Sequence, residues 1–599
     1  MSCIITEEDL SDEFSVFGIE LEDEGVIGKL QEMCTMHRLE ASELVTEWVA
    51  FTHSLKKNVK LEFDALEQFE RERLSKRHQK TPKAVKKEAA PVIHTIDSLP
   101  MDVEGAEELF SSYGGKTPKS KTAVSNKRQH TPENVPMKRF TGPNRSPAVP
   151  FSPASFSPAS TTPAKKYNSR TNRGEVMVSV GKTNNIKWQG SGQSVLIEDY
   201  NTEQSISKDM KYMFQKLSEK RDVLNDIIED MAEHLQKIHN IDELVHLALP
   251  TQEEVTVAGR VCCDSHGKLN PKSVVLEGSI DTSSGKTIPV DLSQLKEYAL
   301  FPGQVVAMAG HNSTGQKFVA SKLFESVTLP LPEIPANTDT KNTRLSVMVA
   351  AGPFSTSDCL SYEPFTDLIE QIQQTRPDVC ILMGPFVDGK NAEIESGKLK
   401  VTFDEIFKQK LDEVAIVTEN LNVQLIVLPS QRDIHHDPVY PTPPYNLEKS
   451  YKHVHFAADP CTLRINNIVF GLTSTDVLFH MGTEEISFPP GSSDRLGRLT
   501  QHLLNQHSYY PYYPPHEDMC IDYEKFFTTC IMPTTPHVLI IPSEFKQFIK
   551  EIKGCCCINP GRLTKGLTGS TFAKIVVQVN ELGNNQSVVK DVSAQVVRI

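Results

Sequence analysis

Three short loops in the C-terminal half of the chain carry residue types that could perform metal-dependent hydrolysis. Each loop follows an apolar run typical of a buried strand, and the loops cover residues 351–354, 384–388 and 430–433. Asp388 and Asp433 offer carboxylates there, and carboxylates with imidazoles are the ligands of two-metal sites. Functional groups of α/β sheets gather at the carboxyl ends of the strands. These loops are therefore the first place to look for chemistry.

The order of strand, loop and helix resembles that of calcineurin-like metallophosphoesterases, whose loops read Asp-x-His, Gly-Asp-x-x-Asp and Gly-Asn-His-Asp/Glu. Seven residues of this chain stand at or beside those positions: Gly352, Phe354, Pro385, Asp388, Gln431, Arg432 and Asp433. Gly352 and Phe354 replace an Asp and a His, and Pro385 replaces the bridging Asp. Gln431 and Arg432 replace Asn and His, so that only the two aspartates remain.

These replacements predict that the site has lost hydrolysis. Proline and phenylalanine cannot ligate a metal, and Arg432 would repel a divalent cation. The distal Gly-His-x-His pattern is also missing after the apolar run 538–541. His435, His436 and His480 are the remaining imidazoles nearby, and a lone histidine is more often a structural hydrogen bonder. We therefore expect no catalytic residue, no metal and no cofactor.

The loops belong to a region, 343–599, in which strands alternate with helices. Apolar runs of the buried-strand type lie at 345–351, 379–383, 423–428, 468–472 and 538–541. Amphipathic stretches lie between them, at 365–372, 403–414 and 496–504. This alternation predicts an α/β domain with a largely buried sheet. Together with the replaced ligands, it predicts a degenerate, inactive calcineurin-like phosphoesterase domain.

Residues 251–328 predict a small β-barrel. Val255, Val257 and Val261 alternate, 305–308 is a buried run, and glycines punctuate the segment. Short strands at this density fit an OB-fold. OB-folds that bind single strands stack bases on aromatic side chains in a basic groove. Here aromatics are sparse and basic residues are scattered, so a structural barrel is preferred.

The segment 207–240 predicts one long amphipathic helix. Met210, Leu217, Leu224, Met231 and Ile238 recur every seven residues, and Phe214, Arg221, Ile228 and Leu235 occupy the complementary heptad position. Such a seam fits a coiled coil, or a long helix packed on its own domain, which is the preferred interpretation.

A barrel that precedes a degenerate phosphoesterase domain resembles the B-subunit family of replicative B-family DNA polymerases (α, δ and ε). The residues that carry this resemblance are Lys211–Leu217, Gly259–Val261, Leu300–Val306, the glycines and asparagine of Gly310–Gly315, Ala350–Phe354 and Asn559–Leu563. The resemblance covers about 210–599. The N-terminal segments are similar to the α-polymerase branch of this family in particular.

The resemblance implies a non-catalytic scaffold. It implies binding to the zinc-bearing C-terminal domain of the catalytic subunit of DNA polymerase α, within a primosome that also holds two primase subunits. Two alternatives stay open. One is an active metal-dependent phosphodiesterase or 3′-exonuclease, and the other is a single-strand-binding OB protein.

Residues 1–78 predict a small helical bundle. Apolar residues keep helical spacing from Val26 to Cys34 and from Leu44 to Leu55, and residues 1–81 lack proline. Residues 1–75 carry a net charge of −11. The bundle could dock other proteins or pack on the body. The family resemblance implies docking of replication factors.

Residues 79–173 predict a disordered basic linker, because proline removes hydrogen-bond donors and keeps the chain extended. Residues 76–173 carry a net charge of +11. A proline follows Thr81 and each of the phosphorylation candidates Thr117, Thr131, Ser146, Ser152, Ser157 and Thr162. Lys165 adds the basic residue that cyclin-dependent kinases favour after Thr162-Pro163. We expect regulation by such a kinase, with a plain solvated linker as the alternative.

Composition excludes several classes of function. The 599 residues carry a net charge of −14, which argues against much direct DNA binding. No apolar window is long enough for a membrane span. The acidic N-terminus is unlike a secretory signal, and twelve cysteines then read as reduced thiols. Paired basic residues in the linker predict nuclear import. The fold expected is a multidomain α+β protein with bundle, linker, barrel and phosphoesterase-like domain.

Overall fold

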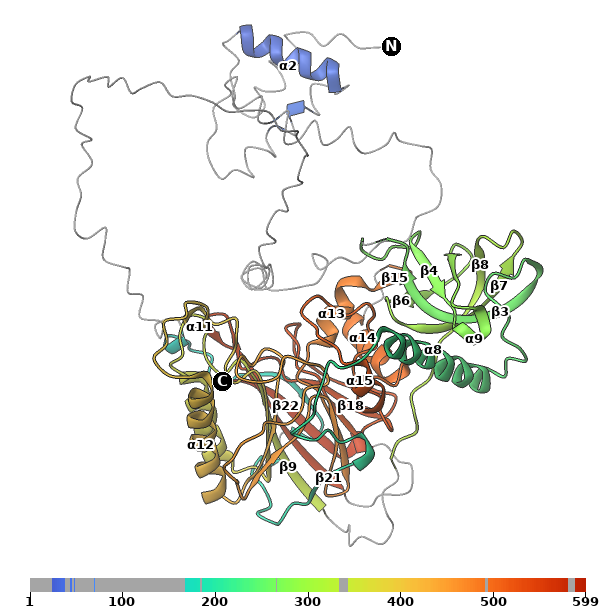
Figure 1. Ribbon diagram of the computed structural model, residues 1–599. Coiled ribbons are helices and arrows are strands. Elements are labelled where there is room, and N and C mark those ends of the chain that lie inside the picture. The colour runs from blue at the N-terminus through green and yellow to red at the C-terminus, as the bar shows by residue number, and fades with distance from the viewer. Residues whose placement is uncertain are drawn as a thin grey trace, which may run out of the picture. The chain divides into compact units, whose positions relative to one another are not determined.

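A computed structural model describes two parts of the chain (Figure 1). Unit 1 covers Met1–Ala90 and unit 2 covers Pro91–Ile599. The described residues are 24–37, 44–45, 48, 69, 167–183, 186–265, 267–332, 343–490, 494–579 and 588–599. Within these ranges no helix is long and apolar enough to cross a membrane.

Unit 1 is described by the helix α2 (Glu24–His37) and by isolated helical residues. Leu30 of α2 is fully buried. The rings of Trp48 and Phe69 meet edge to face with centroids 5.3 Å apart, a contact worth about 0.5–1.5 kcal/mol. The remainder of the bundle predicted over 1–78 lies outside the described residues.

The described part of unit 2 contains two large sheets. The strand order in the seven-stranded sheet is β1 (Val176–Val180), β22 (Val592–Arg598), β21 (Thr571–Val579), β9 (Thr343–Ala351), β10 (Val379–Met383), β11 (Gln424–Leu428) and β12 (Val454–Phe456). The order in the six-stranded sheet is β17 (Phe548–Ile552), β18 (Cys555–Asn559), β16 (Val538–Ile540), β14 (Ile468–Leu472), β13 (Cys461–Ile465) and β2 (Ile197–Asp199).

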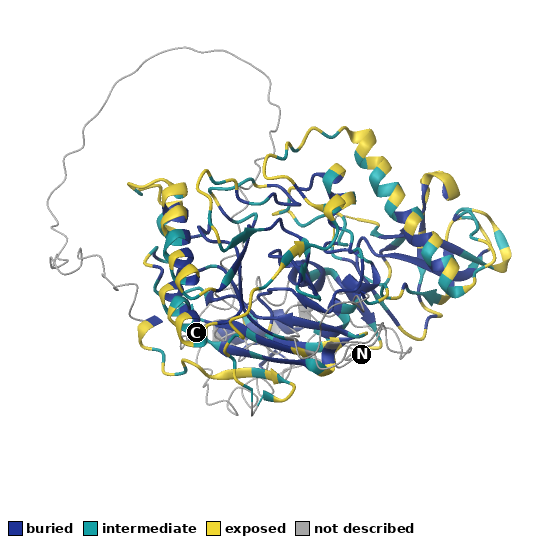
Figure 2. Cartoon of the chain, turned by 90° about the horizontal axis from the view of Figure 1, so that it is seen from below, coloured by how far each residue is buried: buried dark blue, intermediate teal, exposed yellow. Residues whose placement is uncertain are grey.

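The two sheets share one apolar core. Val347 and Val349 of β9 point into it, together with residues of the second sheet such as Phe470. Met348 and Ala350 point the other way, toward helices, because side chains alternate along a strand. Central strands such as β9 and β10 are therefore buried on both faces, and Figure 2 shows the middle of the sheets as buried. The sequence predicted a single buried sheet. Two sheets are present. The sequence does not distinguish these cases, because a strand covered by a second sheet is as apolar as one covered by helices.

Helices cover the outer face of each sheet (Figure 1). The first sheet carries α10 (Glu363–Thr375), α11 (Ala392–Glu395) and α12 (Phe403–Asn420). The second carries α13 (Val477–Glu484), α14 (Arg495–Asn505) and α15 (Tyr523–Thr529). The helix α12 begins with a capping box formed by Thr402 and Glu405, which satisfies backbone amides at its start. A small hairpin pairs β19 (Thr564–Lys565) with β20 (Thr568–Gly569).

The predicted barrel is confirmed. It is closed by β3 (Thr251–Cys263), β4 (Val274–Glu277), β5 (Thr287–Asp291), β8 (Phe318–Phe324) and β7 (Val305–Asn312), with the short helix α9 (Ile280–Ser283). The strand β6 (Tyr298–Leu300) pairs instead with β15 (Ile486–Phe488) of the body. A strand pair therefore ties the barrel to the two-sheet body, by which we mean residues 343–599 of unit 2.

The long helix is shorter than the predicted 207–240. It is α8 (Leu217–His239), because Met213 has a φ of 63°, a left-handed conformation through which a helix cannot continue. Met231 and Leu235 of α8 are buried against the barrel. A helix packed on its own domain was the preferred interpretation, and this packing agrees with it.

The linker predicted over 79–173 ends earlier than expected. Residues 167–173 are ordered on the body, where Tyr167 is 1% exposed and its hydroxyl donates to Asp367 Oδ2 at 2.7 Å. The strand β1 follows directly and pairs with β22. Partners this distant in sequence leave no local pattern, so composition alone placed the boundary wrongly.

Candidate functional site

The three predicted loops lie at one edge of the first sheet. The parallel strands β9, β10 and β11 are in register, with Ala351 beside Met383 and Met383 beside Leu428. Their carboxyl ends therefore meet, where α/β sheets place functional groups. An isolated antiparallel bridge also joins the backbones of Asp388 and Asp433. The structure thus brings the two predicted aspartates together.

Arg432 forms a two-point ion pair with Asp388. Its Nε donates to Oδ1 at 3.1 Å and its Nη2 donates to Oδ2 at 2.5 Å. The two side chains are 25% and 10% exposed. Paired charge-assisted bonds of this kind are among the stronger polar contacts. The guanidinium of Arg432 is therefore bonded to both oxygens of the carboxylate that a metal ion would need as a ligand.

Asp433 is a buried acceptor for the chain's own donors. Its Oδ1 accepts from the backbone N–H groups of Phe386 at 2.5 Å and Val387 at 3.0 Å, and its Oδ2 accepts from the Ser430 N–H at 3.0 Å and the Tyr445 hydroxyl at 2.6 Å. Burial raises the pKa of the Asp433 carboxyl to about 6, although these hydrogen bonds oppose the rise. The carboxylate holds the second and third loops together.

The other residues at replaced ligand positions pack against or bond to their neighbours in the protein. Phe354 is buried in the aromatic core and stacks on Phe386 with centroids 4.8 Å apart. A Cβ on Gly352 would lie 2.1 Å from the carbonyl oxygen of Pro385, so only glycine fits there. Gln431 lies at the rim of the site, with one donor bond of 3.5 Å to a backbone carbonyl.

The nearby histidines pack against aromatic rings. His435 stacks on Phe407 and Tyr445, with centroids 4.3 and 5.4 Å away, and burial lowers its pKa to about 3. One ring nitrogen of His436 bonds to a backbone carbonyl at 2.7 Å. His480 belongs to α13, and burial lowers its pKa to about 3 as well. All three imidazoles thus contact aromatic rings of the protein.

The donor set at this edge does not fit a two-metal centre. Of its carboxylates, one is paired with a guanidinium and the other is saturated by four donors. Across the described residues, no group of three or more His, Cys, Asp or Glu side chains could hold a metal ion. The contacts of these loops stabilise the edge of the sheet.

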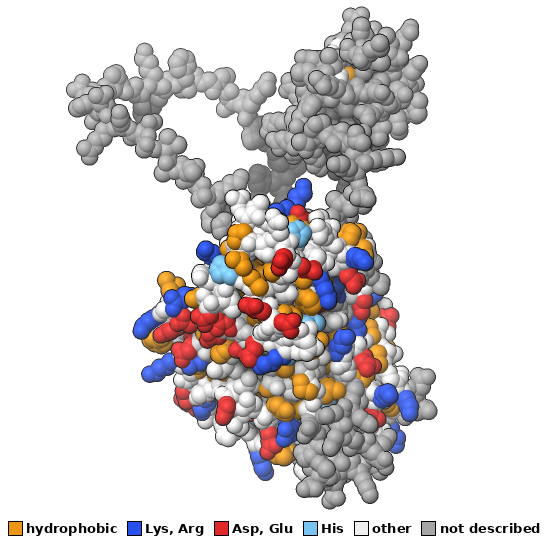
Figure 3. Space-filling model, turned by 90° about the vertical axis from the view of Figure 1, so that its right-hand side faces the viewer, with side chains coloured by type: hydrophobic (Ala, Val, Ile, Leu, Met, Phe, Trp, Pro, Cys, Tyr) orange, Lys and Arg blue, Asp and Glu red, His pale blue; other side chains and the backbone are white. Residues whose placement is uncertain are grey.

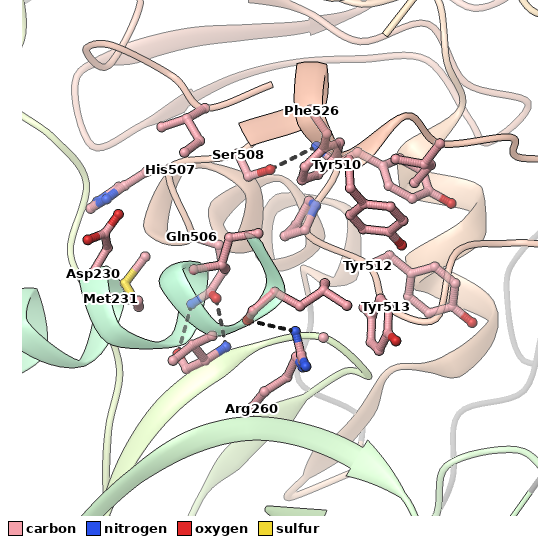
Figure 4. A pocket seen from close by; sticks show the side chains of 18 of the residues that line it. Asp230, Met231, Arg260, Gln506, His507, Ser508, Tyr510, Tyr512, Tyr513 and Phe526 are labelled. Atoms are coloured by element: carbon pink, nitrogen blue, oxygen red, sulfur yellow. Dashed lines mark hydrogen bonds between the residues drawn. The ribbon is translucent and has the colours of Figure 1, made fainter. Parts of the chain in front are cut away.

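A second candidate site, a cavity of about 210 Å³, lies between α8, the barrel and the body. Met231 enters from α8, Arg260 from the barrel, and Tyr512 and Tyr513 from the body (Figure 4). Tyr510, Tyr512 and Tyr513 of a tyrosine-rich run line this cavity. The cavity itself was not predicted, because three segments distant in sequence build it.

Polar contacts at the cavity tie the barrel to the body. Gln506 Oε1 accepts from the N–H of Val305 at 2.8 Å, and its Nε2 donates to the Val305 carbonyl at 3.1 Å. Arg260 pairs with Glu277 at 2.8 Å, and its guanidinium lies 4.5 Å from the ring centroid of Tyr513. Gln506 thus extends the hydrogen bonding of a barrel strand into the body.

The face that carries the barrel has mixed charge. Figure 3 shows acidic and basic side chains interspersed on this face, without one continuous basic surface among the residues it describes. A groove for single-stranded nucleic acid is a basic track with stacking aromatics. The face drawn in Figure 3 does not have that character.

Comparison with known proteins covers most of the chain. The family model for the N-terminal region of the DNA polymerase alpha B subunit matches residues 8–76, and the model for the OB domain of the same B subunit matches 221–326. A third model, for the DNA polymerase alpha/epsilon B subunit, matches 347–550. The OB-domain match includes most of α8, in agreement with the packing of that helix on the barrel.

Relatives named as the B subunit of DNA polymerase alpha align over the full length. The protein of Mus musculus is 43% identical over 609 residues, covering 99% of this chain and 100% of its own. The chain belongs to the family of DNA polymerase alpha B subunits. The family member of Bos taurus is 44% identical, with 90% of each chain covered, and that of Drosophila melanogaster is 28% identical, covering 99% of this chain and 100% of its own.

Proposed function

We propose that this chain is a non-catalytic accessory subunit of the DNA polymerase α–primase complex. It holds the C-terminal zinc-binding domain of the catalytic subunit and the two primase subunits together for RNA–DNA primer synthesis. The full-length alignment with relatives named as the B subunit of DNA polymerase alpha carries this proposal. A subunit with this function acts in the nucleus.

Residues 343–599 act as a degenerate phosphoesterase domain without catalysis. The Arg432–Asp388 pair and the four donors around Asp433 support this. The loops are ordered because their residues hydrogen-bond to one another. The domain supplies a rigid edge on which other subunits assemble, and it needs no cofactor.

The N-terminal residues 1–78 serve as a docking module for replication factors. The match of a dedicated N-terminal family model supports a separate module. The linker, which we now end before Tyr167, tethers this module. Its candidate sites Thr117, Thr131, Ser146, Ser152, Ser157 and Thr162 lie outside the described residues. Phosphorylation by a cyclin-dependent kinase at these sites changes the charge of the tether, since each phosphate adds about −1.5 to −2 charges.

Co-purification tests this function. The tagged full-length chain is purified from dividing cells and its partners are identified by quantitative mass spectrometry. We expect the catalytic subunit of polymerase α and both primase subunits at stoichiometric amounts. Recovery of the chain without them would overturn the proposal. Salt-sensitive binding of the purified chain to single-stranded DNA would instead favour the alternative of a single-strand-binding barrel.

A further inference from the structure

The cavity between α8, the barrel and the body is large enough for a small organic molecule. Its volume is about 210 Å³, whereas an apolar cavity of about 150 Å³ already admits benzene. From Leu224 to His234, α8 forms one wall of the cavity, and ten residues of helix rise about 15 Å along the axis. The cavity therefore has room for a fused two-ring molecule.

The floor of the cavity is aromatic. Tyr510, Tyr523 and Phe526 line it and are 1%, 5% and 6% exposed. Tyr512 and Tyr513 are half-buried, and Figure 4 shows them on the same side of the cavity as Tyr510. Aromatic rings pair with one another in stacked or edge-to-face contacts, so this floor favours a flat aromatic ligand.

The hydroxyl of Tyr523 is a buried polar group without a hydrogen-bond partner among the described residues. Burial raises the pKa of this phenol, Tyr513 raises it further and the Arg260 guanidinium lowers it, so the hydroxyl is protonated at neutral pH. Tyr513 and Arg260 both line the cavity, which places the phenol on the cavity side, and the Nζ of Lys220 lies 4.7 Å from the centre of its ring. An unpaired buried hydroxyl is unfavourable. A ligand that offers an acceptor at this point removes that cost.

Other polar side chains beside the floor are already bonded within the protein. Gln506 uses both atoms of its amide for the backbone of Val305. The Ser508 hydroxyl accepts from the Tyr510 N–H at 3.2 Å, and the Tyr510 hydroxyl accepts from the His516 N–H at 3.2 Å. The Tyr523 hydroxyl is therefore the point at which a ligand gains a hydrogen bond without breaking one.

The charges around the cavity favour an uncharged ligand. The positive charge of Arg260 is paired with Glu277 at 2.8 Å, and Asp230 is exposed at the edge of the cavity. Burial lowers the pKa values of His234 and His507, so both rings are neutral at pH 7. An anion would be repelled by Asp230, and a cation would be repelled by Arg260.

We propose that this cavity binds a small, uncharged, flat aromatic molecule whose carbonyl oxygen accepts a hydrogen bond from the Tyr523 hydroxyl. Two-ring lactams and aryl amides have this chemistry. The other buried lining atom without a partner, Nε2 of His234, lies at the far end of the α8 wall from Leu224, beyond the reach of such a molecule. Because the walls come from α8, the barrel and the body, the ligand holds the barrel against the body.

Equilibrium dialysis of the full-length chain against 2-quinolinone, a fused two-ring lactam, tests this site. Tyr523→Phe removes only the hydroxyl, and Tyr298→Phe is the matched control, because its hydroxyl is also buried without a partner but lies in the core of the barrel. We expect the wild type and Tyr298→Phe to bind with a dissociation constant of roughly 0.1–1 mM, and Tyr523→Phe to bind about fivefold or more weakly. Neither variant should melt below the wild type, since each loses an unpaired buried group.

Limited proteolysis tests the position of the ligand between barrel and body. Bound 2-quinolinone should slow cleavage between them in the wild type, because it stabilises the closed arrangement, and have less effect in Tyr523→Phe. No binding to the wild type at millimolar concentration, or binding to Tyr523→Phe within twofold of the wild type, would overturn the proposal. A lower melting temperature in Tyr523→Phe alone would show that the hydroxyl already has a partner, which also contradicts it. These measurements do not involve polymerase subunits, so their outcome is separate from that of the co-purification.

Discussion

Replacing Asp433 tests whether the former ligand loops are held by internal contacts. In Asp433→Ala, four buried donors lose their acceptor: the backbone N–H groups of Phe386, Val387 and Ser430 and the hydroxyl of Tyr445. At about 1.5 kcal/mol for each orphaned donor, the loss of stability is about 6 kcal/mol. The substitution also removes an ionised group that is unfavourable in the folded state.

The size of that second effect follows from the pKa. Burial raises the pKa of Asp433 from 3.8 to about 6, so the ionised form is disfavoured by roughly 3 kcal/mol at neutral pH. The expected net loss in Asp433→Ala is then about 3 kcal/mol at pH 7.5. A raised carboxyl pKa contributes stability below the unfolded value, and this contribution is lost as the pH rises through 6. The variant should therefore lose about 1 kcal/mol more at pH 5 than at pH 7.5.

Urea unfolding of the full-length chain, followed by circular dichroism at both pH values, measures these losses. Tyr445→Phe is the matched control, because it removes a single donor and should cost about 1–1.5 kcal/mol. An Asp433→Ala variant that is as stable as the wild type, or more stable, would refute the reasoning. A metal-ligand carboxylate kept for catalysis would show that behaviour, since its removal relieves unfavourable charge.

Three other substitutions test separate contacts. Burial lowers the pKa of His435 to about 3, so the contribution of this residue to stability falls by about 2 kcal/mol between pH 7 and pH 5, as the unfolded chain takes up a proton. In His435→Phe this loss is absent, so the melting temperature should fall less over that range than in the wild type, and an identical pH dependence would contradict the assignment. Gln506→Leu leaves the buried N–H and carbonyl of Val305 unpaired, which should lower the free energy of unfolding by about 2–4 kcal/mol. Limited proteolysis should then cleave the chain between barrel and body faster than in the wild type. An unchanged cleavage rate would argue against this contact. In Gly384→Ala the new Cβ would lie 2.4 Å from a carboxylate oxygen, whereas at Gly389 the nearest atom is 3.5 Å away; only the first should lower the melting temperature clearly, and equal effects would count against the close packing.

Much of the fold could be predicted from local pattern. The apolar run at 379–383 became β10 with the same bounds, and the amphipathic stretch at 403–414 lies within α12. Both signals depend only on neighbouring residues. The second sheet could not be predicted, because β14 pairs with β16 across nearly seventy residues, and such pairing leaves no periodicity. The order at Tyr167 has the same origin, since its partner is Asp367.

The candidate site also has features that the sequence predicts and features that it does not. The sequence itself shows that Pro385 and Phe354 have side chains that cannot bind a metal. The contacts that the remaining loop residues make could not be predicted. The pairing of Arg432 with Asp388 and the donation from Tyr445 depend on side-chain directions and on a segment that follows the loops. The start of α8 was predicted too early, since a periodic seam does not reveal the left-handed residue that interrupts it.

The most direct test of the structural role of these loops is the metal content and hydrolytic activity of the purified full-length chain. The chain is purified without chelators, its Mn, Fe and Zn are measured by mass spectrometry, and turnover of a phosphodiester and of a 3′-ended DNA strand is followed with added Mn²⁺. We predict less than one metal ion in ten chains and no turnover above the level of an Asp388→Ala/Asp433→Ala preparation. Stoichiometric metal at these loops together with turnover that the double variant abolishes would contradict the proposal of a non-catalytic role.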